Sequence, residues 1–219
     1  MRNTKMMTCA AALLGMIVTA GYSPDDFSLA DLKDYHKEFR SESVGACSAS
    51  STKTYEDYRA ITDTASIQWR LIHNDMTVDE TTGFLVDKDG FIGVAMGYNF
   101  GALGTRYYVE LDSGIVIPVI KIDAKAAEHA PDGCSAGHDA SVIEFVIDSN
   151  IAKEYFGAAN GLASWGNFNN YEYLKGNIQD IELVLDEKFE EGIVYEDHLT
   201  EEDSELAYGD QVEVIEGGY

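Results

Sequence analysis

Basic residues are scarce in this chain. It has 15 Lys and Arg against 39 Asp and Glu, which gives a formal net charge of −24 at pH 7. Such a charge repels the phosphates of nucleic acids and the head groups of anionic lipids. Half of it lies in residues 186–219, where 13 acids and one base give a net charge of −12. The sequence therefore argues against nucleic acid as a partner, and we expect residues 186–219 to form an acidic tail without a core of its own.

Long apolar runs are missing as well. Residues 6–20 are mostly apolar, but a run of about 15 residues is short for the hydrocarbon core of a bilayer. Arg2 and Lys5 precede this run and small residues end it at Ala20, which is the pattern of a secretory signal peptide. We therefore expect a signal peptide over residues 1–20, a secreted or cell-wall-associated mature chain from Gly21, and no membrane span after cleavage. An uncleaved anchor is the alternative.

Cysteine is limited to three residues, and no CxxC motif or cluster of His and Cys predicts a structural zinc site. Removal of the signal peptide leaves Cys47 and Cys134 as an even pair in an extracellular setting. They form either a disulfide or two unpaired thiols, and the sequence leaves both open. A disulfide would tie the segment before the main domain to the loop between its two strongest strands.

The segment before the main domain, residues 21–54, predicts a helix and a linker. Ser23, Pro24 and the acids after them have the features of a helix start, and the helix is expected to continue to Arg40. Residues 41–54 are rich in Ser and are expected to be the linker.

The main domain, residues 55–185, predicts a mainly β fold. Residues 55–72 are ambiguous between helix and strand, and the alternation of apolar and polar residues over residues 67–71 favours a strand there. Two hairpins follow, residues 84–86 with 91–96 and residues 105–110 with 115–122. We also expect strands at residues 142–147 and 178–185 and a helical turn at residues 149–156, capped by Ser149. Short strands with turns between them are typical of a barrel or a sandwich.

Two carboxylates accompany the most strand-like runs. Asp123 follows an apolar strand directly, and Glu144 lies inside the apolar sequence VIEFVI. A carboxylate in such surroundings must reach solvent, a partner or a polar site, because burying it alone costs several kcal/mol. Glu144 is therefore either an outward-facing residue or a functional acid. Asp123 is either a functional acid or a loop cap that accepts backbone N–H groups.

The loop between these two runs carries His138 and Asp139, and their irregular spacing argues against a metal site. Further along, an aromatic segment includes Trp165, Tyr171 and Tyr173. It either presents its rings to a sugar or covers the open end of the domain.

Three motifs, GFIGVAMGYNFGALGTRYYV, then IDAKA, then SVIEFVID, carry a resemblance to a known family. In this order they resemble the secreted double-psi β-barrels of Firmicutes: the three-aspartate domain, the resuscitation-factor-like wall lytic proteins and, more distantly, the expansin barrel. The resemblance covers about residues 53–184. The chain departs from the family at two places: Met96 to Tyr98 stand where a first aspartate is expected, and Asp123-Ala124-Lys125 replaces an Asp-Thr-Gly sequence.

The resemblance implies a six-stranded double-psi-like β-barrel and a transglycosylase-like cleavage of the MurNAc-GlcNAc bond of peptidoglycan or another envelope glycan. Asp123 would be the acid, and Glu144 or Asp139 would stabilise positive charge in the transition state. His138 and the aromatic residues Trp165, Tyr171 and Tyr173 would contact the substrate. No cofactor is expected. The alternative is a non-catalytic module of expansin type that binds cell-wall carbohydrate or a protein.

Overall fold

The computed structural model describes residues 27–47, 50–157, 167–188, 193–195 and 213–215. The expected signal peptide and Trp165 lie outside these ranges. No helix within them combines the length and the apolar character that crossing a bilayer needs.

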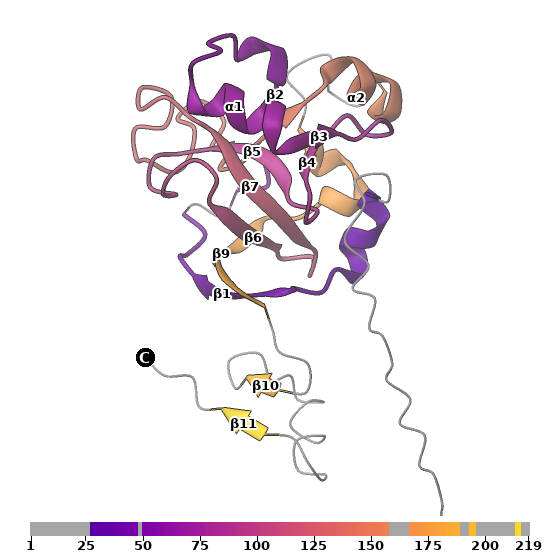
Figure 1. Ribbon diagram of the computed structural model, residues 1–219, viewed down its shortest axis with the longest axis vertical. Coiled ribbons are helices and arrows are strands. Elements are labelled where there is room, and N and C mark those ends of the chain that lie inside the picture. The colour runs from indigo at the N-terminus through magenta and orange to yellow at the C-terminus, as the bar shows by residue number, and fades with distance from the viewer. Residues whose placement is uncertain (1–26, 48–49, 158–166, 189–192, 196–212, 216–219) are drawn as a thin grey trace, which may run out of the picture.

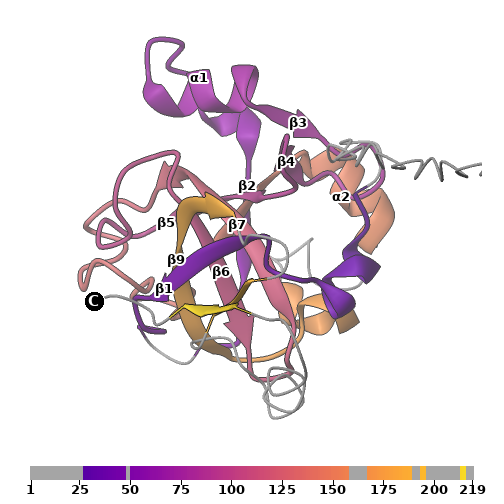
Figure 2. The same cartoon turned by 60° about the horizontal axis from the view of Figure 1, so that its bottom comes forward.

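The described chain is mainly β and forms a nine-stranded mixed sheet (Figures 1 and 2). Seven strands follow one another in the order β1 (Phe39–Ser43), β9 (Ile178–Lys188), β6 (Arg106–Leu111), β7 (Val116–Ala124), β5 (Ile92–Met96), β4 (Leu85–Asp87) and β3 (Met76–Val78). In addition to β7 and β4, β5 also pairs with β8 (Glu144–Ile147). β8 in turn pairs with β2 (Thr54–Asp57). The strand pairs of the described residues do not close into a ring.

Two pairs within this sheet are parallel, β5 with β7 and β2 with β8, and the others are antiparallel. Both predicted hairpins are present: β4 pairs with β5, and β6 pairs with β7. The second sheet pairs β10 (Ile193–Tyr195) with β11 (Glu213–Ile215) in parallel. Both of its strands belong to the acidic tail, most of which lies outside the described residues.

Each face of the large sheet carries apolar packing. The main core collects alternate residues of the central strands, such as Val94, Val109 and Phe145. The second core lies on the opposite face and includes Tyr108 and Val146. Because both faces are covered, these strands read as nearly continuous apolar runs in the sequence.

The predicted helix at residues 23–40 and linker at residues 41–54 are replaced in part by a strand. Residues 23–26 and 48–49 lie outside the described residues. Among the described residues from 27 to 54, the helical element is η2 (Leu29–Asp34), a 3-10 helix that buries Leu29 and Leu32, and β1 follows it. The Tyr108 hydroxyl accepts the backbone N–H groups of Glu38 and Phe39, and β1 then pairs along β9. This tertiary pairing outweighs the local helical pattern.

The predicted strand at residues 67–71 is wrong, because α1 (Ile67–Asn74) occupies it. The Ser66 hydroxyl accepts the N–H of Trp69 and caps the helix. One helical turn later His73 stacks on Trp69, with ring centroids 3.9 Å apart. A cap and contacts between residues four apart favour the helix over the short alternation.

The predicted helical turn after β8 is present as α2 (Ser149–Phe156), and its cap differs. The Asp148 carboxylate, not Ser149, accepts the first N–H groups of the helix. The Ser149 hydroxyl instead donates to Asp57 at 2.5 Å and so ties α2 to β2. After α2, η6 (Phe168–Asn170) and η7 (Glu172–Leu174) lead to β9.

Candidate functional site

The register of the sheet brings two of the predicted acids into one row. Ala95 on β5 pairs with Asp123 on β7 on one side and with Glu144 on β8 on the other. Directly paired residues share a face of the sheet, and neighbouring strands lie about 4.8 Å apart, so the two backbones are roughly 10 Å apart. The small side chain of Ala95 between them leaves the space above the row open.

A β-bulge in β7 is needed for this row. Val94 pairs with Lys121, and the next residue, Ala95, pairs with Asp123, so Ile122 is the extra residue. Strict alternation along β7 would place Asp123 on the face of Val119, which belongs to the main core. The extra residue of the bulge shifts the alternation of side chains by one and so places Asp123 on the opposite face of the sheet.

A third acid, Glu56, completes what we term the carboxyl cluster: Glu56, Asp123 and Glu144. Thr54 pairs with Glu144, and Glu56 lies two residues further along β2, on the same face. Its Oε1 atom is buried without a hydrogen-bond partner. Burial, followed by a side-chain hydrogen bond to Asp123 and the negative charges of Asp123 and Glu144, raises the pKa of Glu56 to about 9. The sequence did not identify Glu56 as a site residue. Its one indication there is that Glu56 follows Tyr55, so that in a strand the two side chains point to opposite faces.

Glu144 is half-buried and lines the same pocket as the rest of the cluster. Burial is the main cause that raises the pKa of its carboxyl group, and the charges of Asp139 and Asp123 act in the same direction. Lys125 opposes them and is the largest influence that lowers this pKa. The site therefore combines the cation of Lys125 with several acids.

The carboxyl cluster lines a pocket of about 1460 Å³ that is open to solvent. Its walls come from β2, from the ends of β5, β7 and β8, from the segment 124–141 and from the start of α2. Tyr55, His129 and Lys153 add an aromatic ring and basic groups to this wall. A pocket of this size with convergent polar groups suits a ligand of several rings.

The loop at residues 125–141 is held from three sides. Cys134 forms a disulfide with Cys47, with Cα atoms 6.1 Å apart. The backbone N–H of Asn99 donates to the Gly133 carbonyl at 3.0 Å. A Cβ atom added to Gly97 would meet that same carbonyl oxygen at 2.1 Å, so only glycine permits this approach. The loop is therefore anchored at Gly133 and Cys134, between the residues through which it lines the pocket.

Asp139 and His138 line the pocket from this loop. Asp139 accepts the N–H of Ser141 and lies 3.2 Å from the largely exposed imidazole of His138. Asp139 therefore has a local structural task besides its charge. Within the described part of the chain, His, Cys, Asp and Glu side chains form no group of three or more that could hold a metal ion.

The aromatic residues predicted as substrate contacts lie elsewhere. The Tyr171 ring packs on Phe156 with centroids 4.5 Å apart, and its hydroxyl donates to the Phe156 carbonyl. Tyr173 packs against the main core, and neither tyrosine lines the carboxyl pocket. This part of the segment covers the core. Trp165 lies outside the described residues.

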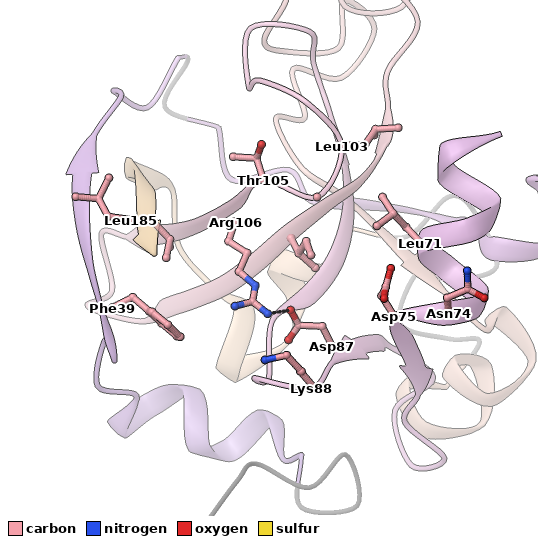
Figure 3. A pocket seen from close by; sticks show the side chains of 13 residues that line it. Phe39, Leu71, Asn74, Asp75, Asp87, Lys88, Leu103, Thr105, Arg106 and Leu185 are labelled. Atoms are coloured by element: carbon pink, nitrogen blue, oxygen red, sulfur yellow. Dashed lines mark hydrogen bonds and ion pairs between the residues drawn. The ribbon is translucent and has the colours of Figure 1, made fainter. Parts of the chain in front are cut away.

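A second pocket, of about 660 Å³, lies around Arg106 (Figure 3). The Arg106 guanidinium donates to Asp87 at 2.5 Å and to Asp89 at 2.6 Å, and it lies over the Phe91 ring. Asp87 also accepts the N–H groups of Asp89 and Phe91. These contacts hold the β4–β5 turn in place. The charged groups of Arg106 and Asp87 therefore stabilise the fold at this pocket.

The chain was compared with models of protein families, with curated proteins and with solved structures, and none of them matches it. The geometry of the carboxyl pocket is therefore the main ground for a functional proposal.

Proposed function

We propose that this protein is an exported cell-envelope glycosidase of the lytic transglycosylase type, which acts on peptidoglycan or a related glycan through its carboxyl cluster. One observation carries the proposal: the carboxyl cluster lines an open pocket, where burial and the neighbouring acids raise the pKa of Glu56 to about 9, so that this group can hold a proton at neutral pH. Cleavage of a glycosidic bond requires a protonated acid beside a carboxylate. The signal-peptide pattern supports export.

We also propose the double-psi-like barrel as the scaffold. Six strands follow one another as neighbours in the order β2, β8, β5, β7, β6 and β9. The gap between β2 and β9 is bridged at the start of both strands, where Ile178 donates its N–H to the Ser50 carbonyl and the Lys53 ammonium donates to the Gly176 carbonyl. Residues from all six strands meet in or against the main core. The two parallel pairs are in keeping with crossed barrel connections.

In the proposed reaction, Glu56 carries the proton and is hydrogen-bonded to Asp123. Asp123 delivers this proton to the leaving oxygen as the bond from that oxygen to the anomeric carbon breaks. Glu144, as a carboxylate, stabilises the oxocarbenium-like transition state. The pair then takes a proton back from a hydroxyl group of the same sugar, whose oxygen closes the anhydro ring without water.

The test is digestion of purified peptidoglycan by the mature chain, residues 21–219, with mass spectrometry of the soluble products. We expect anhydro-muropeptides from the wild type and a loss of at least about 100-fold for Asp123→Asn, Glu56→Gln and Glu144→Gln. The matched control is Glu128→Gln, because the Glu128 side chain is 81% exposed and does not line the pocket. It should retain full activity.

The alternative is a non-catalytic module that binds wall carbohydrate or a protein. One observation favours it: Met96, which stands in place of the first aspartate of the family, is fully buried in the main core. The same digestion separates the two. If no product is released and the protein sediments with the wall material, the glycosidase proposal fails and the binding module replaces it.

A further inference from the structure

Lys125 is a buried cation beside the carboxyl cluster. It follows Ala124, the last residue of β7, and its backbone N–H donates to the Met96 carbonyl at 3.0 Å. Its Nζ atom donates to both the carbonyl and the hydroxyl oxygen of Ser141, each at 2.9 Å. The residue is 8% exposed and lines the carboxyl pocket. Its ammonium is therefore fixed in position rather than free to follow a carboxylate.

Acids from several elements line the same pocket as this ammonium. Glu144 projects from β8 and Glu56 from β2, while Asp139 comes from the loop at residues 125–141. Asp123 lies two residues before Lys125, and the exposed His138 also acts on Glu144. None of the ion pairs between described residues includes Lys125. The positive charge of Lys125 therefore acts on these acids through its electrostatic field and not through a direct ion pair.

We propose that Lys125 is a positioning residue for the protons of the site: its ammonium, held by Ser141, keeps Glu144 ionised while the proton of the cluster stays on the Glu56–Asp123 pair. For its catalytic meaning this inference rests on the proposed glycosidase function. The distribution of protons itself is a property of the folded protein without substrate.

Burial lowers the pKa of Lys125 itself, and the charges of Glu144, Asp139 and Glu56 oppose this. The directions of the pKa shifts of the acids agree with the proposed arrangement. Lys125 lowers the pKa of Glu144 against burial and two negative neighbours, and its charge acts in the lowering direction on Glu56 as well. For Glu56, however, burial and Asp123 dominate and the pKa stays raised to about 9. Removal of the charge at position 125 should therefore raise the pKa of Glu144 further.

The test is a pH titration of the side-chain carboxyl groups by ¹³C NMR in the mature chain labelled on glutamate, with Glu144 assigned by its absence from Glu144→Gln. In Lys125→Met we expect the titration midpoint of Glu144 to rise by about one pH unit or more, a tenfold change in proton affinity. Lys125→Arg should restore a midpoint near that of the wild type. The control Lys153→Met removes an exposed cation of the same pocket and should leave the midpoint unchanged.

An unchanged Glu144 midpoint in folded Lys125→Met protein overturns the inference. If circular dichroism shows that this variant does not fold, Lys125→Gln makes the same comparison, because it removes the charge but keeps a donor for Ser141. The pH profile of peptidoglycan cleavage is a second readout: its acidic limb should move to higher pH in the neutral variants. If the Glu144 midpoint shifts but the protein cleaves no peptidoglycan, the role of Lys125 is supported and the glycosidase function is contradicted. If the protein cleaves peptidoglycan but the midpoint does not shift, the glycosidase function is supported and the role of Lys125 is contradicted.

Discussion

Glu56 shows how one side chain acquires its chemistry from its neighbours. In the sequence it is an ordinary glutamate between Tyr55 and Asp57. In the fold its carboxyl group lies against Asp123, with one oxygen buried and unpaired. The cost of a negative charge in these surroundings keeps the group protonated.

A pH dependence of stability follows for Glu56. Its pKa is raised from 4.5 to about 9 in the folded protein, so the folded state binds more protons between these values. The stabilising contribution is thus fully present below pH 4.5 and is lost as the pH rises through about 9. The Glu56→Gln variant should lack this loss. At pH 9 we expect it to exceed the wild type in free energy of unfolding by roughly 3 kcal/mol, if half of the shift survives relaxation of the site.

Urea denaturation of both proteins at pH 5 and pH 9 measures this difference. Exposed Glu128 supplies the control, since Glu128→Gln should follow the wild type at both pH values. Parallel losses of stability in wild type and Glu56→Gln would show that Glu56 is ionised in the native state at neutral pH.

Among the elements, the bulge in β7 and the loop at residues 125–141 do most to place the site. The bulge directs Asp123 to the face of Glu144. The loop supplies Lys125, Asp139 and Ser141 to the pocket, and it rests on the turn after β5. Gly97 is the point of closest approach between the two.

Gly97→Ala should therefore displace this loop. A Cβ atom there would lie 2.1 Å from the Gly133 carbonyl oxygen and 2.5 Å from its carbon, and a backbone group cannot yield as a flexible side chain can. We expect a loss of about 2 kcal/mol or more in the free energy of unfolding and a lower rate of peptidoglycan cleavage. The control is Gly137→Ala in the same loop, where the nearest atom is 3.8 Å away. Equal thermal stability of the two variants would contradict this account of Gly97.

For the whole molecule, the disulfide between Cys47 and Cys134 joins parts that are 87 residues apart. One end follows β1 at the sheet edge, and the other lies in the loop that borders the pocket. The bond therefore stabilises the fold and the site together.

We expect the double variant Cys47→Ala/Cys134→Ala to lose roughly 4 kcal/mol of unfolding free energy, because a cross-link that closes a long loop restricts the unfolded chain. Thermal unfolding with and without reductant checks this: the reductant should lower the midpoint of the wild type and leave that of the double variant unchanged. Equal midpoints of oxidised wild type and double variant would show that the bond adds no stability.

Local patterns in the sequence were sufficient for the central strands. Alternating apolar residues and Asp/Gly turns predicted both hairpins, the strand of Glu144 and the last strand, because each hairpin is closed by neighbours along the chain. Local patterns did not predict β1, whose partner β9 is distant in sequence. They also did not predict α1, where the Ser66 cap favours a helix over the strand that the short alternation indicates.

The sequence by itself determined the mainly β character, the strong negative charge and the candidates Asp123 and Glu144. Only the tertiary structure decided that Glu56 joins them, because β2 and β8 pair in parallel across a long stretch of chain. It also decided that Asp123 shares their face, since one bulged residue reverses the alternation. Proton affinity depends on burial and on charges a few ångströms away, and those distances exist only after the strands have paired.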